Sequence, residues 1–336
     1  NQEVTVTYKG QHLPWGVGLY DIERGRMTEA APFFWQTDTT VATDTWAYKA
    51  GLELYTVKEE LDQLVDIVSK NGALLLNIAP RGDGIIPEDQ EALLRGMGAW
   101  LKIHGEAIYK TVPWQVAEEG DVRFTRRGKH LYAHFLGVPD EDLVIANLGT
   151  ARMGGLTIRA ASLLGSDEPV AWDQAEKALT IRLPDNAAGN PLPVVRFELS
   201  GQGCINFWPT LTHHPAGYAV EAVGTVVNFS DQPIEDRAGR TYLFEGDAGL
   251  GNHVQVNLAP GEEQEVRFEH SDQATYGARA SVIPGDQPVV TLRFGFGKTR
   301  SPEKHVLLPG LGLQGAWRFK AADEAAFAEV SWDDTT

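Results

Sequence analysis

The most constraining feature of this sequence is a helix signal that runs directly into a continuous apolar stretch. Thr56 and Glu59 form a capping-box pattern, in which each side chain can bond the backbone of the other residue. Apolar side chains then recur at helical spacing, at Val57, Leu61, Leu64, Val65 and Val68. Asn71-Gly72 supplies a stop signal. Residues 73–78 (ALLLNI) read as a strand that we expect to be buried on both faces of a parallel sheet.

The first 112 residues continue this alternation of strands and helices. Alternating apolar residues predict a strand that ends near Tyr8, and residues 33–40 predict a second strand. Pro87 is a preferred first residue for a second amphipathic helix, which extends to about residue 101. Strands that alternate with helices indicate βα units and a parallel sheet.

From about residue 113 the apolar period changes to two, which indicates an all-β region. Short alternating segments are separated by Gly, Pro and Asp, as in β-sandwich domains. We expect one β-sandwich at 113–208 and a second sandwich-like module at 217–300. The linker between them contains His213-His214, and residues 301–336 form a separate tail.

The charge balance limits the kinds of ligand. The chain has 46 Asp and Glu against 29 Lys and Arg, a formal net charge of −17. This disfavours a nucleic-acid surface, because such surfaces need clustered cations, and it favours a neutral ligand. No apolar run reaches the roughly 18 to 20 residues of a membrane span. The single Cys204 excludes an internal disulfide and a multi-cysteine metal site.

Several short sequence motifs near the N-terminus resemble those of a known family. These motifs are residues 35–40 (WQTDTT), 44–49 (DTWAYK), 64–84 (LVDIVSKNGALLLNIAPRGDG), 86–88 (IPE) and 98–109 (GAWLKIHGEAIY). Together they resemble glycoside hydrolase family 29, the α-L-fucosidases. Residues 115–200 look like the C-terminal β-sandwich of that family. Residues 315–336 resemble the opening of the jelly-roll domain of family 2 glycosidases.

This resemblance implies a catalytic (β/α)8-type barrel, a fold of about 250 residues. Only about 110 residues precede the sandwich here. The expected fold class is therefore α/β plus all-β: an incomplete, half (β/α)8-type barrel followed by two β-sandwich-like domains. The resemblance also implies that the nucleophile of the family, an Asp at the end of the fourth barrel strand, has no counterpart. Because half a barrel leaves sheet edges and one apolar face uncovered, we expect a homo-oligomer formed through residues 1–110.

Glycoside hydrolysis requires two carboxyl groups beside the scissile bond. Carboxylates follow or precede the predicted elements at Asp21, Glu23, Asp38, Asp44, Glu53 and Asp83. Glu23 is our predicted general acid/base, because aromatic residues in its loop could raise its pKa; the alternative is an ion pair with Arg24 or Arg26. Asp44 and Glu53 complete the predicted catalytic set. Asp38 and Asp44 could each be a replacement nucleophile or a turn cap.

A sugar site also needs an aromatic platform with polar partners. Trp35, Gln36, Trp46 and Tyr48 are the predicted substrate-binding residues, with core or loop packing as the alternative for the aromatic ones. No cofactor or metal is expected, because a carboxylate pair performs this reaction alone.

The sequence therefore supports two hypotheses of different classes. The first is an exo-acting glycoside hydrolase that acts on a carbohydrate substrate, either an α-L-fucoside or, after a change of specificity, a β-galactoside or β-glucoside. The second is a non-catalytic carbohydrate-binding or structural remnant of a larger carbohydrate-active enzyme.

Overall fold

The computed structural model describes residues 6–9, 18–31, 34–139, 141–153, 156–201, 210–213, 219–233, 242–244, 254–256, 258–269, 275–282 and 287–295. The predicted tail 301–336 lies outside these residues, as does Cys204. In the described part, no helix is long and apolar enough to cross a membrane.

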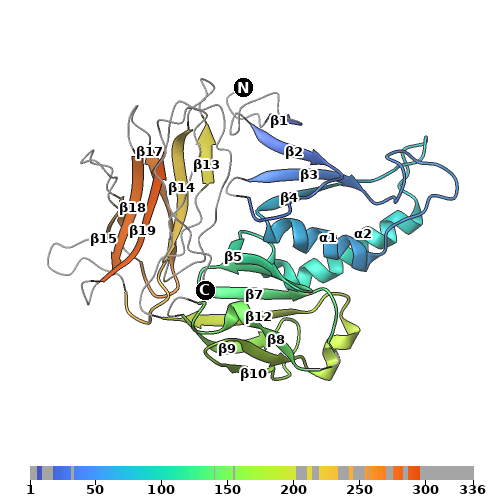
Figure 1. Cartoon of the computed structure of the whole chain (residues 1–336). Coiled ribbons are helices and arrows are strands. Elements are labelled where there is room, and N and C mark those ends of the chain that lie inside the picture. Colours follow the sequence, from blue (N-terminus) through green and yellow to red (C-terminus); the bar gives the residue numbers. More distant parts are fainter. Residues whose placement is uncertain are drawn as a thin grey trace.

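The N-terminal part of the chain forms a four-stranded parallel sheet in the order β1-β2-β3-β4. Its strands are β1 (Thr7–Tyr8), β2 (Leu19–Glu23), β3 (Trp35–Thr40) and β4 (Gly72–Asn77). Helices α1 (Val57–Ser69) and α2 (Glu88–His104) lie along one side of this sheet, between it and the β-sandwich (Figure 1). The predicted parallel βα arrangement is present.

Local sequence explains where α1 begins and ends. The Thr56 hydroxyl accepts a hydrogen bond from the Glu59 backbone N–H at 3.2 Å, and the Glu59 carboxylate accepts one from the Thr56 N–H at 2.7 Å, which completes the predicted capping box. At the other end Asn71 adopts a φ of +70°, a conformation that Asn tolerates better than most residues. Strand β4 starts directly afterwards at Gly72. Side-chain atoms of Trp35 and Ile67 would lie within 2.8 Å of any added Cβ there.

Strand β4 is buried on one face only, so the prediction of burial on both faces is wrong. Leu74 and Leu76 pack toward the helices, whereas Leu75 is 53% exposed. The physical reason is that, within the described residues, helices cover only one face of this sheet.

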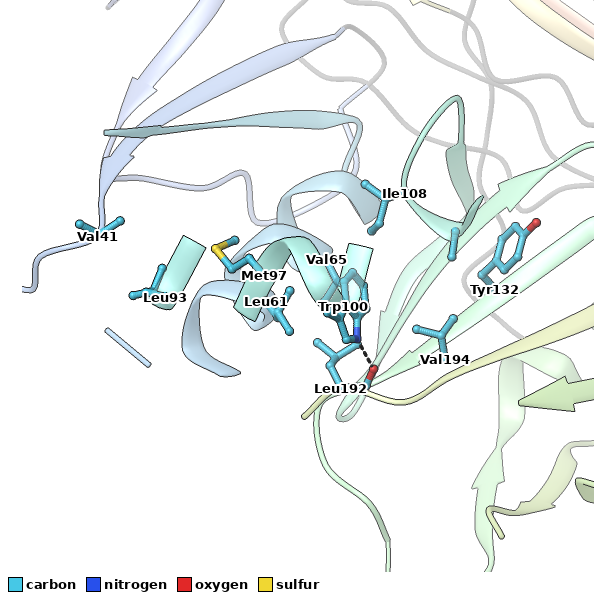
Figure 2. Packing of buried hydrophobic residues seen from close by; sticks show 11 residues of the cluster. Val41, Leu61, Val65, Leu93, Met97, Trp100, Ile108, Tyr132, Leu192 and Val194 are labelled. Atoms are coloured by element: carbon cyan, nitrogen blue, oxygen red, sulfur yellow. Dashed lines mark hydrogen bonds between the residues drawn. The ribbon is translucent and has the colours of Figure 1, made fainter. Parts of the chain in front are cut away.

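One continuous core joins the parallel sheet, the helices and the β-sandwich (Figure 2). It begins at Val41 after β3, continues through Leu61 of α1 and Met97 of α2, and reaches Val194 in the sandwich. The indole N–H of Trp100 donates to the Leu192 carbonyl at 2.8 Å, which attaches α2 to the sandwich. Burial of this cluster fixes the sheet relative to the sandwich.

The sandwich consists of a five-stranded sheet in the order β5-β6-β7-β12-β9 and a three-stranded sheet in the order β10-β11-β8. The first contains β5 (Val112–Glu119), β6 (Val122–Arg127), β7 (His130–Phe135), β9 (Thr157–Leu163) and β12 (Val194–Ser200). The second contains β8 (Leu143–Ile145), β10 (Ala171–Gln174) and β11 (Leu179–Arg182). Three short 3-10 helices lie at Gly105–Ala107, Ala146–Leu148 and Asp185–Gly189.

A further β region follows the sandwich. Its strands are β13 (Thr210–His213), β14 (Ala219–Val227), β15 (Tyr242–Phe244), β16 (Val254–Val256), β17 (Glu263–Glu269), β18 (Thr275–Val282) and β19 (Gln287–Gly295). β13 lies inside the segment predicted as a linker and pairs with β14. The fully buried Arg126 of β6 bonds Glu263 of β17 at 3.2 Å, so an ion pair connects this region to the sandwich.

Candidate functional site

Polar side chains gather on the face of the parallel sheet that points away from the helices. Strand register places Asp21 beside Gln36, Glu23 beside Asp38, and Thr40 beside Asn77, whereas Trp35 and Leu74 occupy the opposite, helix-facing side. We call this helix-free surface the open face. Its residues are Lys9, Asp21, Glu23, Gln36, Asp38, Thr40, Ala73, Leu75 and Asn77.

Three carboxylates of the open face converge on one ammonium group. The Lys9 Nζ lies 2.8 Å from Asp38 Oδ2, 3.0 Å from Glu23 Oε2 and 3.5 Å from Asp21 Oδ2. The hydrogen bond to Asp38, followed by the bond to Glu23, raises the pKa of Lys9 above its ordinary value, against the opposing effect of burial. Three carboxylates around one cation leave an excess of negative charge when all are ionised.

Asp38 and Asp21 are held more firmly than Glu23. Asp38 Oδ1 is buried and has no hydrogen-bond partner among the described residues, although Oδ2 bonds Lys9. Asp21 is 5% exposed and accepts a hydrogen bond from Gln36 Nε2 at 3.2 Å. The Glu23 side chain is 54% exposed. The cluster thus contains one carboxylate oxygen that is free to accept a new bond and one carboxylate that is open to solvent.

The segment after β3 forms one end of this face. It leaves the sheet at Val41 and returns at Tyr55, whose N–H donates to the Val41 carbonyl at 3.0 Å. Asn77 donates to Thr40 Oγ1 at 3.1 Å and to the Trp46 carbonyl at 3.0 Å, which ties this segment to the end of β4. The Arg24 guanidinium lies 4.6 Å from the centre of the Trp46 ring, a cation–π contact at the end of β2.

The predicted site residues divide into those that reach the open face and those that do not. Glu23 and Gln36 lie on it, and Trp46 lies at its edge. Glu23 pairs with Lys9, not with Arg24 or Arg26. Asp44 pairs with Lys49 in the segment after β3, and Glu53 and Tyr48 are exposed on the same segment. The structure does not bring Asp44 or Glu53 into the carboxylate cluster.

Trp35 is a correction to the predicted sugar platform. It is 0% exposed, packs with Ala31 and Ile67, and donates its indole N–H to the Lys70 carbonyl at 2.9 Å. Strand alternation is the reason: Gln36 points to the open face, so its neighbour Trp35 must point to the helices.

Lys9 is the residue that sequence reasoning missed. Glycosidase and sugar-binding chemistry point to carboxylates and aromatic side chains, and a lysine after a short strand carries no motif. The signal was nevertheless present, because strand alternation places Lys9 on the face opposite the buried Tyr8. Among the described residues, no group of three or more His, Cys, Asp or Glu side chains is arranged to hold a metal ion.

Known proteins that are similar to this chain include alpha-L-fucosidases. Residues 4–106 match the family model described as alpha-L-fucosidase. Plasma alpha-L-fucosidase of Pongo abelii is 36% identical over 162 residues, which cover 46% of this chain and 34% of that protein. Tissue alpha-L-fucosidase of Rattus norvegicus is 35% identical over 181 residues, 51% of this chain and 38% of that protein. The resemblance stated from the sequence motifs is confirmed, and the chain spans about a third of the length of these relatives.

Solved structures give partial matches. Thermotoga maritima alpha-fucosidase has a TM-score of 0.45 at 28% identity, with 53% of this chain and 42% of that chain covered. Alpha-L-fucosidase isoenzyme 1 from Paenibacillus thiaminolyticus has a TM-score of 0.49 at 24% identity, with 54% and 45% covered.

Proposed function

We propose that this chain, whose residues 4–106 match the alpha-L-fucosidase family model, hydrolyses the bond to a terminal sugar at its open face. The observation that carries the proposal is the convergence of Glu23, Asp38 and Asp21 on Lys9. Family membership supports a glycosidase, and the cluster supplies the paired carboxylates that such a reaction needs.

The spacing of two carboxylates supports a retaining mechanism. Glu23 Oε2 and Asp38 Oδ2 bond the same nitrogen at 3.0 and 2.8 Å, so these oxygens lie no more than about 5.8 Å apart. Carboxyl groups of retaining glycosidases are about 5 to 5.5 Å apart, whereas inverting enzymes need about 6.5 to 9.5 Å to admit a water molecule. Asp44 and Glu53 lie outside the cluster and have no role in this proposal.

Each carboxylate has a distinct role. Asp38, whose side chain is 22% exposed, attacks the anomeric carbon, and the bond to the leaving oxygen breaks. Glu23 in its protonated form, open to solvent, gives its proton to that oxygen. Water then attacks the glycosyl–Asp38 ester and returns its proton to Glu23, so the free sugar leaves and both carboxyls regain their starting states.

Gln36, Trp46 and Tyr48 are the proposed substrate contacts. The Gln36 amide already bonds Asp21, and Trp46 borders the open face through the bond from Asn77 to its carbonyl. Tyr48 is 44% exposed on the same segment. Amide and aromatic groups suit the hydroxyl edges and C–H faces of a sugar.

In this proposal, a complete site needs barrel strands from a second copy of the chain. The four strands of the parallel sheet correspond to half of an eight-stranded barrel, and Leu75 on the open face is 53% exposed. The proposal includes the division into a half barrel at 1–112, sandwiches at 113–208 and 217–300, and a tail at 301–336. Two copies would close the barrel through residues 1–110. Light scattering tests this closure, because it requires a particle of at least twice the 36.8 kDa chain mass.

Hydrolysis is tested with nitrophenyl glycosides. An α-L-fucoside is expected to be the best substrate, with a β-galactoside and a β-glucoside as the alternatives. Glu23→Gln and Asp38→Asn should each lower kcat by at least about 100-fold. Asp44→Asn is the matched control and should retain activity. No release above the buffer blank from any substrate would contradict the proposal.

A non-catalytic role is the second candidate, and Lys9 is the observation that favours it. Its ammonium occupies the centre of the carboxylate cluster, as expected for a structural ion-pair network. Titration calorimetry distinguishes the two functions: sugar binding with no turnover in any of the assays above would support a carbohydrate-binding remnant.

A further inference from the structure

A recess lies on the other side of the helices, between α2 and the β-sandwich. Its volume is about 450 Å³, within the range of small-molecule sites. One wall is the C-terminal half of α2, with Ala99, Trp100 and Ile103, and the other consists of the sandwich turns 163–166 and 186–191. We call this recess the junction groove. It shares no residue with the open face.

The walls of the junction groove are fixed by specific contacts. Gly165 has a φ of +78°, and an added Cβ would lie 2.6 Å from Ile103 Cγ2, so only glycine lets this turn approach α2 so closely. The hydrogen bond from Trp100 Nε1 to the Leu192 carbonyl holds α2 against the end of the 186–191 turn (Figure 2). A preorganised groove loses little free energy in ordering when a ligand binds.

The groove carries no charge. None of its fourteen lining residues is Asp, Glu, Lys or Arg. Its one titratable residue, His104, bonds the Trp100 carbonyl through Nδ1 at 2.9 Å and faces the Asn190 amide nitrogen through Nε2 at 3.0 Å. Burial lowers the pKa of His104, against the raising effect of its bonds to the backbone of Trp100 and Leu164, and so favours the uncharged ring. A charged ligand group would have no counter-ion here, so the ligand is neutral.

The polar groups that remain are hydroxyl and amide groups beside apolar walls. Ser166 Oγ accepts from Asn186 Nδ2 at 2.8 Å and from the Glu168 N–H at 3.0 Å, which leaves its hydrogen to donate. Asn186 is exposed at the same position and offers its carbonyl oxygen. Leu163 and Pro191 provide apolar surface next to them. This combination fits a ring with C–H faces and a perimeter that both donates and accepts hydrogen bonds.

From this geometry we infer that the junction groove is a second binding site, for a neutral pyranose sugar. It is separate from the proposed catalytic site and does not depend on hydrolysis. Its position between α2 and the sandwich would let the chain hold a saccharide away from the open face.

Sugar titrations of the full chain by saturation-transfer NMR and calorimetry test this inference. The probes are the methyl glycosides of fucose, galactose and glucose, with glucuronate as the charged comparison. Ala99→Trp fills the groove from an exposed helix position, and Ala92→Trp places the same side chain on an exposed part of α2 outside the groove. Glu23→Gln reports on the open face.

We expect at least one neutral glycoside to bind wild type, Ala92→Trp and Glu23→Gln alike. Ala99→Trp should weaken that binding by at least tenfold, and glucuronate should bind at least tenfold more weakly than the neutral sugar. Three outcomes would overturn the inference: no binding of any neutral sugar, equal binding by Ala99→Trp and wild type, or an equal loss in Ala92→Trp. If a neutral sugar binds the groove but the protein hydrolyses no nitrophenyl glycoside, only the catalytic proposal is refuted.

Discussion

Single residues show how burial and charge shape this chain around its open face. Lys9 bonds or pairs with carboxylates that come from two strands, so its charge offsets part of the negative charge of the acidic cluster. Glu60 of α1, in contrast, shows the effect of burial on a carboxylate. Its side chain is 0% exposed, its Oε1 has no hydrogen-bond partner in the described part, and burial raises its pKa to about 7. Glu59 adds to this shift, and Arg26 opposes it.

Glu60 therefore predicts a pH-dependent loss of stability. Its pKa is higher in the folded than in the unfolded chain, so the folded state binds more protons and the free energy of unfolding falls as the pH rises from about 4.5 to about 7. Glu60→Gln should remove this dependence, with a stability close to wild type at pH 4.5 and about 1 to 3 kcal/mol higher at pH 8. Urea titrations at several pH values measure the difference, and parallel pH curves for the two proteins would contradict it.

At the scale of single elements, the parts of the fold with local signals were predictable. The α1 capping box and the stop at Asn71 follow from bonds within a few residues, and both are present. Burial and pairing were harder, because they depend on residues far along the chain. β13 was read as a linker but pairs with β14, and Leu75 was expected to be buried but lies on an uncovered face.

The candidate site also combines features with local sequence signals and contacts between residues far apart in the chain. The sequence predicts Gln36 in a strand, where it lies, but it predicts Glu23 in a loop, whereas Glu23 is the last residue of β2. It could not show that a lysine fourteen residues before Glu23 would meet both Glu23 and Asp38, since that contact needs the β1–β2–β3 register. It predicts Trp35 as a substrate-binding residue, but strand alternation turns Trp35 toward the helices, because Gln36 points to the open face.

The α1 cap offers a prediction at this scale. Thr56→Ala removes the side chain that accepts the Glu59 N–H, and leaves a donor of the first turn without its partner. We expect the free energy of unfolding to fall by about 1 kcal/mol, within a range of about 0.5 to 2. Thr56→Ser, which keeps the hydroxyl, is the control and should stay close to wild type. Equal stability of the alanine and serine variants would argue against the cap.

For the whole molecule, the shared core fixes the sheet to the sandwich. The proposed assembly of two chains uses the open face. An exposed sheet edge and face favour pairing with another copy. Leu75→Lys places a charge on that face and should convert the proposed oligomer to a monomer. Val144→Lys makes the same change at a 60% exposed strand position of the sandwich and should not. Light scattering of both variants measures this. A wild-type monomer, or identical masses for the two variants, would rule out assembly through the open face.

Covalent trapping tests most directly whether the Glu23–Asp38 pair is a glycosidase site. A 2-deoxy-2-fluoro glycosyl fluoride of the best nitrophenyl substrate should slow the second step and leave a sugar ester on the enzyme. Intact-mass and peptide analysis should place one fluoroglycosyl group on Asp38 in wild type and none on the Asp38→Asn variant. A label on Asp44, or steady hydrolysis with no label on any open-face carboxylate, would contradict the account.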